Sequence, residues 1–79
     1  MNMDLGSWSD GIAAAVRAEM FSQHRTRADL AHVLGVTEPT AANRLNAETP
    51  FNLVELERVA HWLGLATSEL VARAGGPPT

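Results

Sequence analysis

The chain contains no cysteine, which excludes disulfide bonds, thiol catalysis and zinc sites built on cysteine. Lysine is absent as well, so all six cationic side chains are arginines. No apolar run approaches the roughly 20 residues that span a bilayer. The first ten residues have neither the basic segment nor the apolar segment of a signal peptide. We therefore expect a cytoplasmic protein.

Residue patterns that would indicate catalysis or metal binding are also missing. No nucleophile, base and orienting acid can be placed together, and no glycine-rich phosphate loop is present. The three histidines do not have the spacing of metal ligands on one helix. The Met20-Phe21 pair is expected in the core rather than in a ligand site. The sequence thus predicts no enzymatic activity, no cofactor, no metal and no small-molecule substrate.

The charge of the chain is small and unevenly distributed. The net charge of −3 over 79 residues argues against binding nucleic acid by bulk electrostatics. Residues 24–46, however, hold three arginines and two acids, a net charge of +1. The remainder holds three arginines and seven acids, a net charge of −4. The small basic excess therefore lies in the segment that carries the motif described next.

Apolar spacing and capping residues predict an all-α fold, a compact bundle of about five short helices. The first helix is expected from about Trp8 to Gln23, with Ser7 as its N-cap. The next three are expected to begin at Thr26, Thr37 and Asn52, and the fifth is expected to be capped by Thr67. We expect one domain over residues 1–74. The breaker cluster at residues 75–79 predicts a flexible tail or the start of a linker.

Residues 26–46 have the pattern of a helix-turn-helix. Two helices that cross steeply need small residues where they touch, and Ala31 and Ala41 meet that need. The turn needs a residue tolerant of positive φ, and Gly35 stands there. Val36 follows and is positioned to pack the turn into the core. All four requirements are met at consistent spacing.

The segment TRADLAHVLGVTEPTAANRLN resembles the lambda-repressor-like (Cro/repressor, XRE-type) helix-turn-helix family. The resemblance covers about residues 12–70, including LVELERVAHWLGLATSEL near the end. The Pro-Thr-Ala and Arg-Leu-Asn elements look most like immunity repressors of actinobacterial phages and prophages. The resemblance implies sequence-specific binding of duplex DNA as a transcriptional repressor in the bacterial host cytoplasm. Dimers in this family gain affinity by pairing two half-sites, so the resemblance is compatible with a homodimer but does not fix the oligomeric state. No membrane partner is expected.

In this family the second helix of the motif lies in the major groove and reads base edges. If Ala41 and Leu45 face inward, the opposite face carries the candidate base-contacting residues. An asparagine amide pairs with adenine, a glutamate accepts from cytosine, and apolar groups contact the thymine methyl. These candidates are Glu38, Pro39, Ala42 and Asn43. For Glu38, a favourable interaction with the helix dipole is an equally good explanation.

The phosphate backbone is expected to be contacted by arginines, hydroxyls and amides around the motif. Arg27 lies in the first turn of the helix where the family usually contacts phosphate. Arg44 has two alternatives, a phosphate contact or a structural pair with a carboxylate. The full set of candidates is Arg25, Thr26, Arg27, Thr37, Arg44, Asn46, Thr49 and Asn52.

A second function class stays open at this point. Recognition helices of the family are commonly richer in basic residues, and no arginine or lysine occurs from Leu45 to Glu57. Together with the acidic net charge, this scarcity fits a protein-interaction regulator, such as an antitoxin or antirepressor, that keeps the fold without strong DNA binding.

Overall fold

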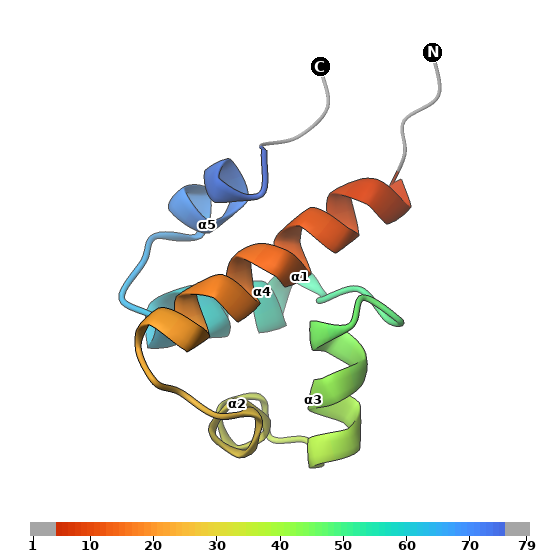
Figure 1. The fold of residues 1–79 in the computed structure, drawn as a ribbon, viewed down its shortest axis with the longest axis vertical. Helices are drawn as coiled ribbons and strands as arrows, with labels where there is room; N and C mark the ends of the chain where they lie inside the picture. The colour runs from red at the N-terminus through yellow and green to blue at the C-terminus, as the bar shows by residue number, and fades with distance from the viewer. Residues whose placement is uncertain (1–4, 76–79) are drawn as a thin grey trace.

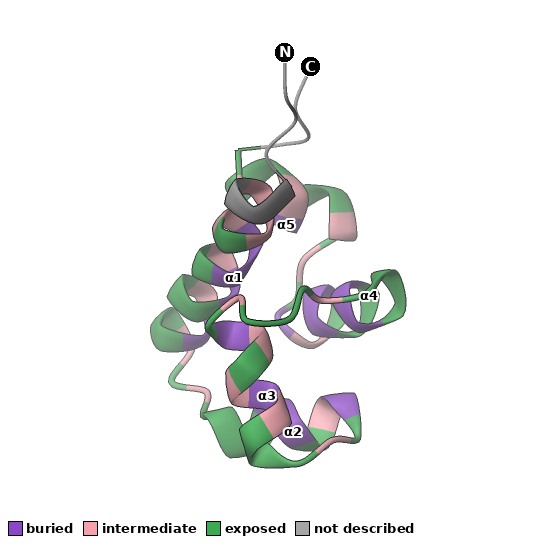
Figure 2. Ribbon diagram, turned by 90° about the vertical axis from the view of Figure 1, so that its right-hand side faces the viewer, coloured by how far each residue is buried: buried purple, intermediate pink, exposed green. Residues whose placement is uncertain are grey.

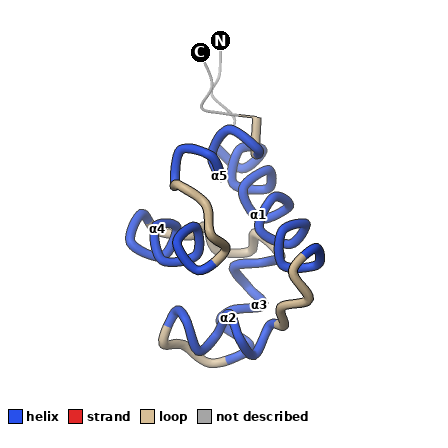
Figure 3. The backbone as a smooth tube through the Cα atoms, turned by 90° about the vertical axis from the view of Figure 1, so that its left-hand side faces the viewer, coloured by secondary structure: helices blue, strands red, loops and turns tan. Residues whose placement is uncertain are grey.

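The computed structural model describes residues 5–75, which form five helices joined by short loops and contain no strand (Figures 1 and 3). The all-α fold predicted from the sequence is confirmed. Of the predicted tail, only Gly75 lies within the described residues. The helices are α1 (Leu5–Ser22), α2 (Arg27–Leu34), α3 (Glu38–Leu45), α4 (Leu53–Trp62) and α5 (Thr67–Arg73).

Three helix starts follow the predicted caps. Thr26 accepts the Asp29 N–H at 3.1 Å, and the Asp29 carboxylate accepts the Thr26 N–H at 3.0 Å, a reciprocal capping box. These hydrogen bonds hold the pKa of Asp29 below its ordinary value. Thr37 caps α3, with its hydroxyl accepting the Thr40 N–H at 3.4 Å. Asn52 caps α4.

Two predicted caps are wrong. Helix α1 begins at Leu5, so Ser7 lies inside the helix and not at its N-cap. No proline stands near this end of the chain to stop the backbone from continuing the helix toward the N-terminus. At α5 the N-cap is Ala66, and Thr67 is the first helical residue. The Glu69 carboxylate supplies the capping bond by accepting the Ala66 N–H at 3.0 Å.

The core is built from the apolar faces of all five helices. Val16, Leu30, Val59 and Leu70 are its largest fully buried side chains. Met20 is buried as expected, but Phe21 is 85 % exposed and lies outside the core. Helix α1 faces inward with Ile12, Val16 and Met20 at a four-residue spacing, so the next position turns its side chain to solvent.

The helices are arranged so that α2 and α3 lie at the end of the domain opposite α5 and the start of α1 (Figures 1 and 3). Helix α3 packs against α1 and α2, and α4 packs against α2 and α5. Helices α1 and α5 approach closely at Gly11, where an added Cβ would lie 2.8 Å from the Ala74 carbonyl oxygen. None of the helices in residues 5–75 combines the length and the apolar character that crossing a membrane requires.

Candidate nucleic-acid interface

The crossing of α2 and α3 has the small residues and the turn that the motif requires. Ala31 and Ala41 are buried, Ala41 completely. Gly35 has a left-handed φ of 69°, and the Val36 N–H donates to the Ala31 carbonyl at 3.0 Å. Val36 is half-buried against the core. A side chain larger than alanine at the crossing would push the helices apart, so this contact sets their mutual geometry.

The face of α3 opposite its buried residues is open to solvent. Helix α3 has both buried and exposed positions (Figure 2). Ala41 and Leu45 are buried, whereas Glu38, Pro39 and Asn43 are exposed. Ala42 is half-buried. All four predicted base-contacting positions therefore come from one short helix, and three of them are exposed. Apart from Glu38, this set carries no charge.

The start of α2 lies beside the start of α3. The Arg27 guanidinium and the Glu38 carboxylate are 3.9 Å apart, and both side chains are more than half exposed. Such a pair is loose, because solvent screens it and both side chains keep their freedom. Arg27 therefore lies near α3 while remaining accessible. Thr26, one residue earlier, is exposed and caps α2 with its hydroxyl.

Arg44, in the last turn of α3, points to α4 and pairs with Glu55. Its Nε lies 3.0 Å from Glu55 Oε1, and its Nη2 lies 3.4 Å from Oε2. The two side chains are only 18 % and 11 % exposed. The structural alternative for Arg44 is therefore the contact that the structure shows.

Burial raises the pKa of the Glu55 carboxyl, but the hydrogen bonds from Arg44 and from the Asn52 N–H outweigh this effect. The net result is a pKa below the ordinary value of 4.5. The Asn52 N–H donates to Glu55 at 3.0 Å, and the Glu55 N–H donates to the Asn52 side chain at 2.8 Å. Glu55 therefore stays ionised at neutral pH and serves both the helix cap and the ion pair.

The other predicted phosphate-contacting residues are distributed over the loops around the motif. The Arg25 guanidinium lies 4.7 Å from the centre of the Trp62 ring and donates to Gln23 at 2.8 Å. The remaining positions are exposed: Thr37, Asn46, Thr49 and Asn52.

Three contacts at this end of the domain were missed by the sequence analysis. Arg17 of α1 donates to the carbonyl of Leu45 at the end of α3. Gln23 donates to the Leu63 carbonyl at 2.8 Å. The third is the stacking of Arg25 on Trp62. The sequence shows Arg17, Gln23 and Arg25 as polar residues in and after the first helix, but nothing in it indicates their partners.

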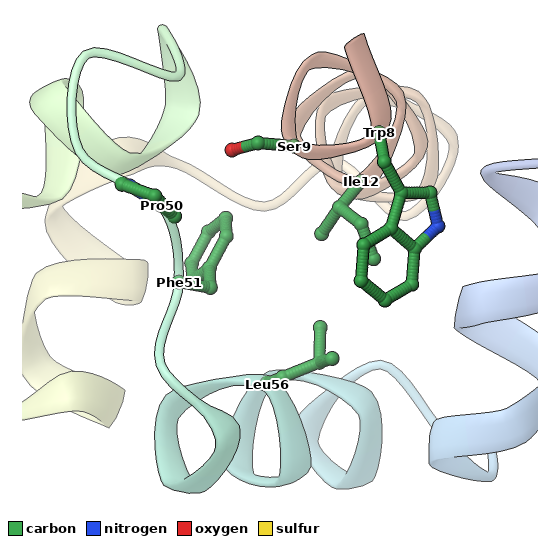
Figure 4. A pocket seen from close by; sticks show the side chains of 6 residues that line it. All are labelled: Trp8, Ser9, Ile12, Pro50, Phe51 and Leu56. Atoms are coloured by element: carbon green, nitrogen blue, oxygen red, sulfur yellow. The ribbon is translucent and has the colours of Figure 1, made fainter. Parts of the chain in front are cut away.

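A separate hollow lies between α1, α4 and the loop that precedes α4 (Figure 4). Its volume is about 260 Å³, and the rings of Trp8 and Phe51 stand on opposite sides of it. The other lining residues are Ser9, Ile12, Pro50 and Leu56. These side chains offer no acid, base or metal ligand. Within residues 5–75, no group of three or more histidine, aspartate or glutamate side chains is placed to hold a metal.

The fold and the exposed face of α3 define a helix-turn-helix domain. The model of the BetR domain matches residues 9–79, so the chain belongs to the BetR domain family, a regulator domain of the helix-turn-helix type. Its structure is similar to that of the clp gene regulator ClgR from Corynebacterium glutamicum. The two share 19% identity with a TM-score of 0.80, over 86% of this chain and 72% of that chain. At this identity the likeness shows the fold. No curated protein matches the sequence.

Proposed function

We propose that this chain binds duplex DNA in a sequence-specific manner and regulates transcription, with α3 lying in the major groove. The observation that carries the proposal is the two-sided character of α3. One side buries Ala41 and Leu45 at the crossing with α2, and the other presents Asn43 to solvent. Family membership and the ClgR-like fold support the same function.

Base recognition is assigned to the exposed face of α3. The Asn43 amide is suited to a bidentate pair with adenine, while Pro39 and Ala42 are suited to contact a thymine methyl. Glu38 is suited to accept from cytosine, in competition with its approach to Arg27. These contacts discriminate among base pairs without a cation.

Phosphate binding is assigned to the residues around the two helix starts and the loop after α3. Arg27 is the strongest of these candidates because it is charged and accessible. The neutral candidates are Thr26, Thr37, Asn46, Thr49 and Asn52. Arg25 contributes if it leaves Trp62, and Arg44 if it leaves Glu55.

The finer proposal is a repressor of the phage or prophage type. It rests on the resemblance of residues 12–70 to that group. Such a repressor acts by occupying an operator, with no chemistry. A homodimer on two half-sites would compensate for the few cations of a single domain, because once one half-site is occupied the second binds intramolecularly at a high effective concentration.

The test is a gel shift with duplex DNA across a range of salt concentrations, with and without unlabelled competitor. Arginine contacts to phosphate predict affinity that falls steeply with salt, together with preference for one sequence over competitor. Absence of any shift at low salt would overturn the proposal.

A protein-interaction regulator is the second candidate. The observation that favours it is that the arginines near α3 are largely engaged within the domain, as Arg44 is with Glu55. In a chain of net charge −3, little positive charge is then left for DNA. A folded protein that shifts no duplex in the experiment above would support this candidate.

A further inference from the structure

Helices α3 and α4 are consecutive in the chain but are not closely packed against each other within the described residues. Helix α3 rests on α1 and α2, and α4 rests on α2 and α5. The Arg44–Glu55 ion pair spans this gap, from the last turn of α3 to the first turn of α4. An ion pair between side chains therefore joins α3 to α4, whereas the other neighbouring helices are joined by direct helix–helix packing.

The geometry of the Arg44–Glu55 ion pair restrains the orientation of both side chains. Two hydrogen bonds join the guanidinium to both carboxylate oxygens, which restrains the plane of the group as well as its distance. Both side chains are largely sheltered from water, so screening by solvent and salt is weaker than for a surface pair. By contrast, the Arg27–Glu38 pair at the other end of α3 is exposed and loose.

Both ends of the link are themselves fixed. Glu55 exchanges two hydrogen bonds with Asn52, so its carboxylate is tied to the start of α4. From the opposite direction, Arg17 of α1 donates to the Leu45 carbonyl, one residue beyond Arg44. The last turn of α3 is thus held between α1 and α4.

We infer that Glu55 and Arg44 are positioning residues for DNA recognition, and that their ion pair fixes the rotation of α3 and hence the direction of Asn43. The inference rests on the proposed function. Asn43 immediately precedes Arg44, and a helix turns as a unit. A rotation of α3 that separates Arg44 from Glu55 therefore moves Asn43 through the same angle.

For the removal of Glu55, a positioning role and simple electrostatics predict opposite changes in DNA affinity. Removing an acid near the DNA-binding face should strengthen DNA binding if only charge matters. Removing Glu55 should instead weaken binding to the preferred sequence, because α3 loses its alignment. Glu55→Gln is suitable because glutamine also serves in a capping box, so the start of α4 is preserved. Glu48→Gln is the matched control, an exposed acid in the loop between the same helices.

The experiment measures the dissociation constants of the preferred duplex and of a scrambled duplex at several salt concentrations, below the melting midpoint of every variant. Glu55→Gln should reduce the ratio of specific to non-specific affinity by about tenfold, as expected when one base contact is misaligned. Glu48→Gln should leave that ratio unchanged. Arg44→Met, which keeps the apolar stem, should reduce the ratio equally and leave the salt slope intact. The double variant should lose no more than either single variant.

Two results would overturn the inference. In one, Glu55→Gln behaves like Glu48→Gln and strengthens binding to both duplexes. In the other, Arg44→Met lowers the salt slope by about one and weakens both duplexes equally, which marks a phosphate contact. Failure of the proposed function has a different signature, since the unaltered protein would then not distinguish the two duplexes. The unaltered protein is measured first for this reason.

Discussion

At the scale of single residues, the arginines decide how much positive charge the domain offers to DNA. Within residues 5–75, five of the six have a partner inside the domain, and Arg58 is the one without a hydrogen bond or ion pair. The partners differ in strength. Arg44 is sheltered with Glu55, while Arg27 is loosely paired and accessible. Charge counted from the sequence therefore overstates what is available for phosphate.

Asn43→Ala should remove one base contact and little else. We expect a loss of about 1–3 kcal/mol on the preferred duplex and weaker selectivity at one base position per half-site. Thermal stability should barely change, because Asn43 is exposed and alanine favours helix. The measurement is binding to duplexes that vary at that position. Asn46→Ala, at a predicted phosphate contact, should weaken all of these duplexes alike. Uniform loss from Asn43→Ala would show that Asn43 only positions the helix on DNA.

Arg27→Ala should weaken binding to all duplexes and reduce the salt slope by about one, as expected for a lost phosphate contact. The comparison is Arg73→Ala, because Arg73 pairs with Glu19 between α5 and α1. That variant should leave the slope unchanged. If Arg27→Ala altered sequence preference at an unchanged slope, Arg27 would be a base reader.

The lowered pKa of Glu55 should make the stability of the fold depend on pH. Its pKa is lower in the folded protein than its ordinary value of 4.5, so its stabilising effect is complete above that value. The effect is lost as the pH falls through the lower, folded pKa. Denaturant unfolding between about pH 5 and pH 3 should therefore show a steeper loss of stability for the unaltered protein than for Glu55→Gln. Glu48→Gln should lose stability as steeply as the unaltered protein. If the free energy of unfolding fell equally with pH in all three proteins, the lowered pKa would not belong to Glu55.

The sequence predicts the exposed residues of α3 but not the partner of Arg44. Helical geometry with Ala41 and Leu45 inside is enough to place Asn43 outside. The Arg44–Glu55 pair depends on the path of the intervening loop, where Ala47 has a left-handed φ of 59°. Alanine gives no sign of that conformation, because residues other than glycine seldom adopt it.

At the scale of elements, the sequence predicts the start of a helix well where the cap residue forms a local hydrogen bond with the first turn. Thr26, Thr37 and Asn52 each cap the helix predicted for them. The start of α5 was misplaced because a threonine looked like the cap, whereas Glu69 reaches back to the Ala66 N–H. A glutamate at the third helical position satisfies that group without a polar N-cap side chain.

Ala41→Leu should disrupt the crossing of α2 and α3. Ala41 is fully buried, so three added carbon atoms must displace neighbours, and we expect destabilisation of about 1–3 kcal/mol. Thermal melting provides the measurement, with Ala14→Leu on the exposed face of α1 as the control. An unchanged midpoint for Ala41→Leu would mean that the crossing has room to spare.

At the scale of the whole molecule, the acidic balance and the basic requirement of DNA binding coexist because they lie in different places. The helix-turn-helix is at one end of the domain, and α5 and the start of α1 are at the other (Figure 1). The excess of acids is outside residues 24–46. Of the remaining acids, Asp10, Glu19 and Glu69 belong to α1 and α5, which lie outside the motif, whereas Glu48 and Glu55 adjoin the end of α3. Repulsion of phosphate is therefore limited only for the first group.

The most direct test of the account is selection of duplex DNA from a random pool by the unaltered protein, followed by affinity measurements across salt. The account predicts an enriched half-site with adenine under Asn43 and thymine under Pro39 and Ala42, with a cytosine only where Glu38 reaches a base edge. It also predicts affinity that falls as salt rises. Selection of no sequence at all, or of a half-site with G·C pairs where Asn43, Pro39 and Ala42 lie, would contradict it.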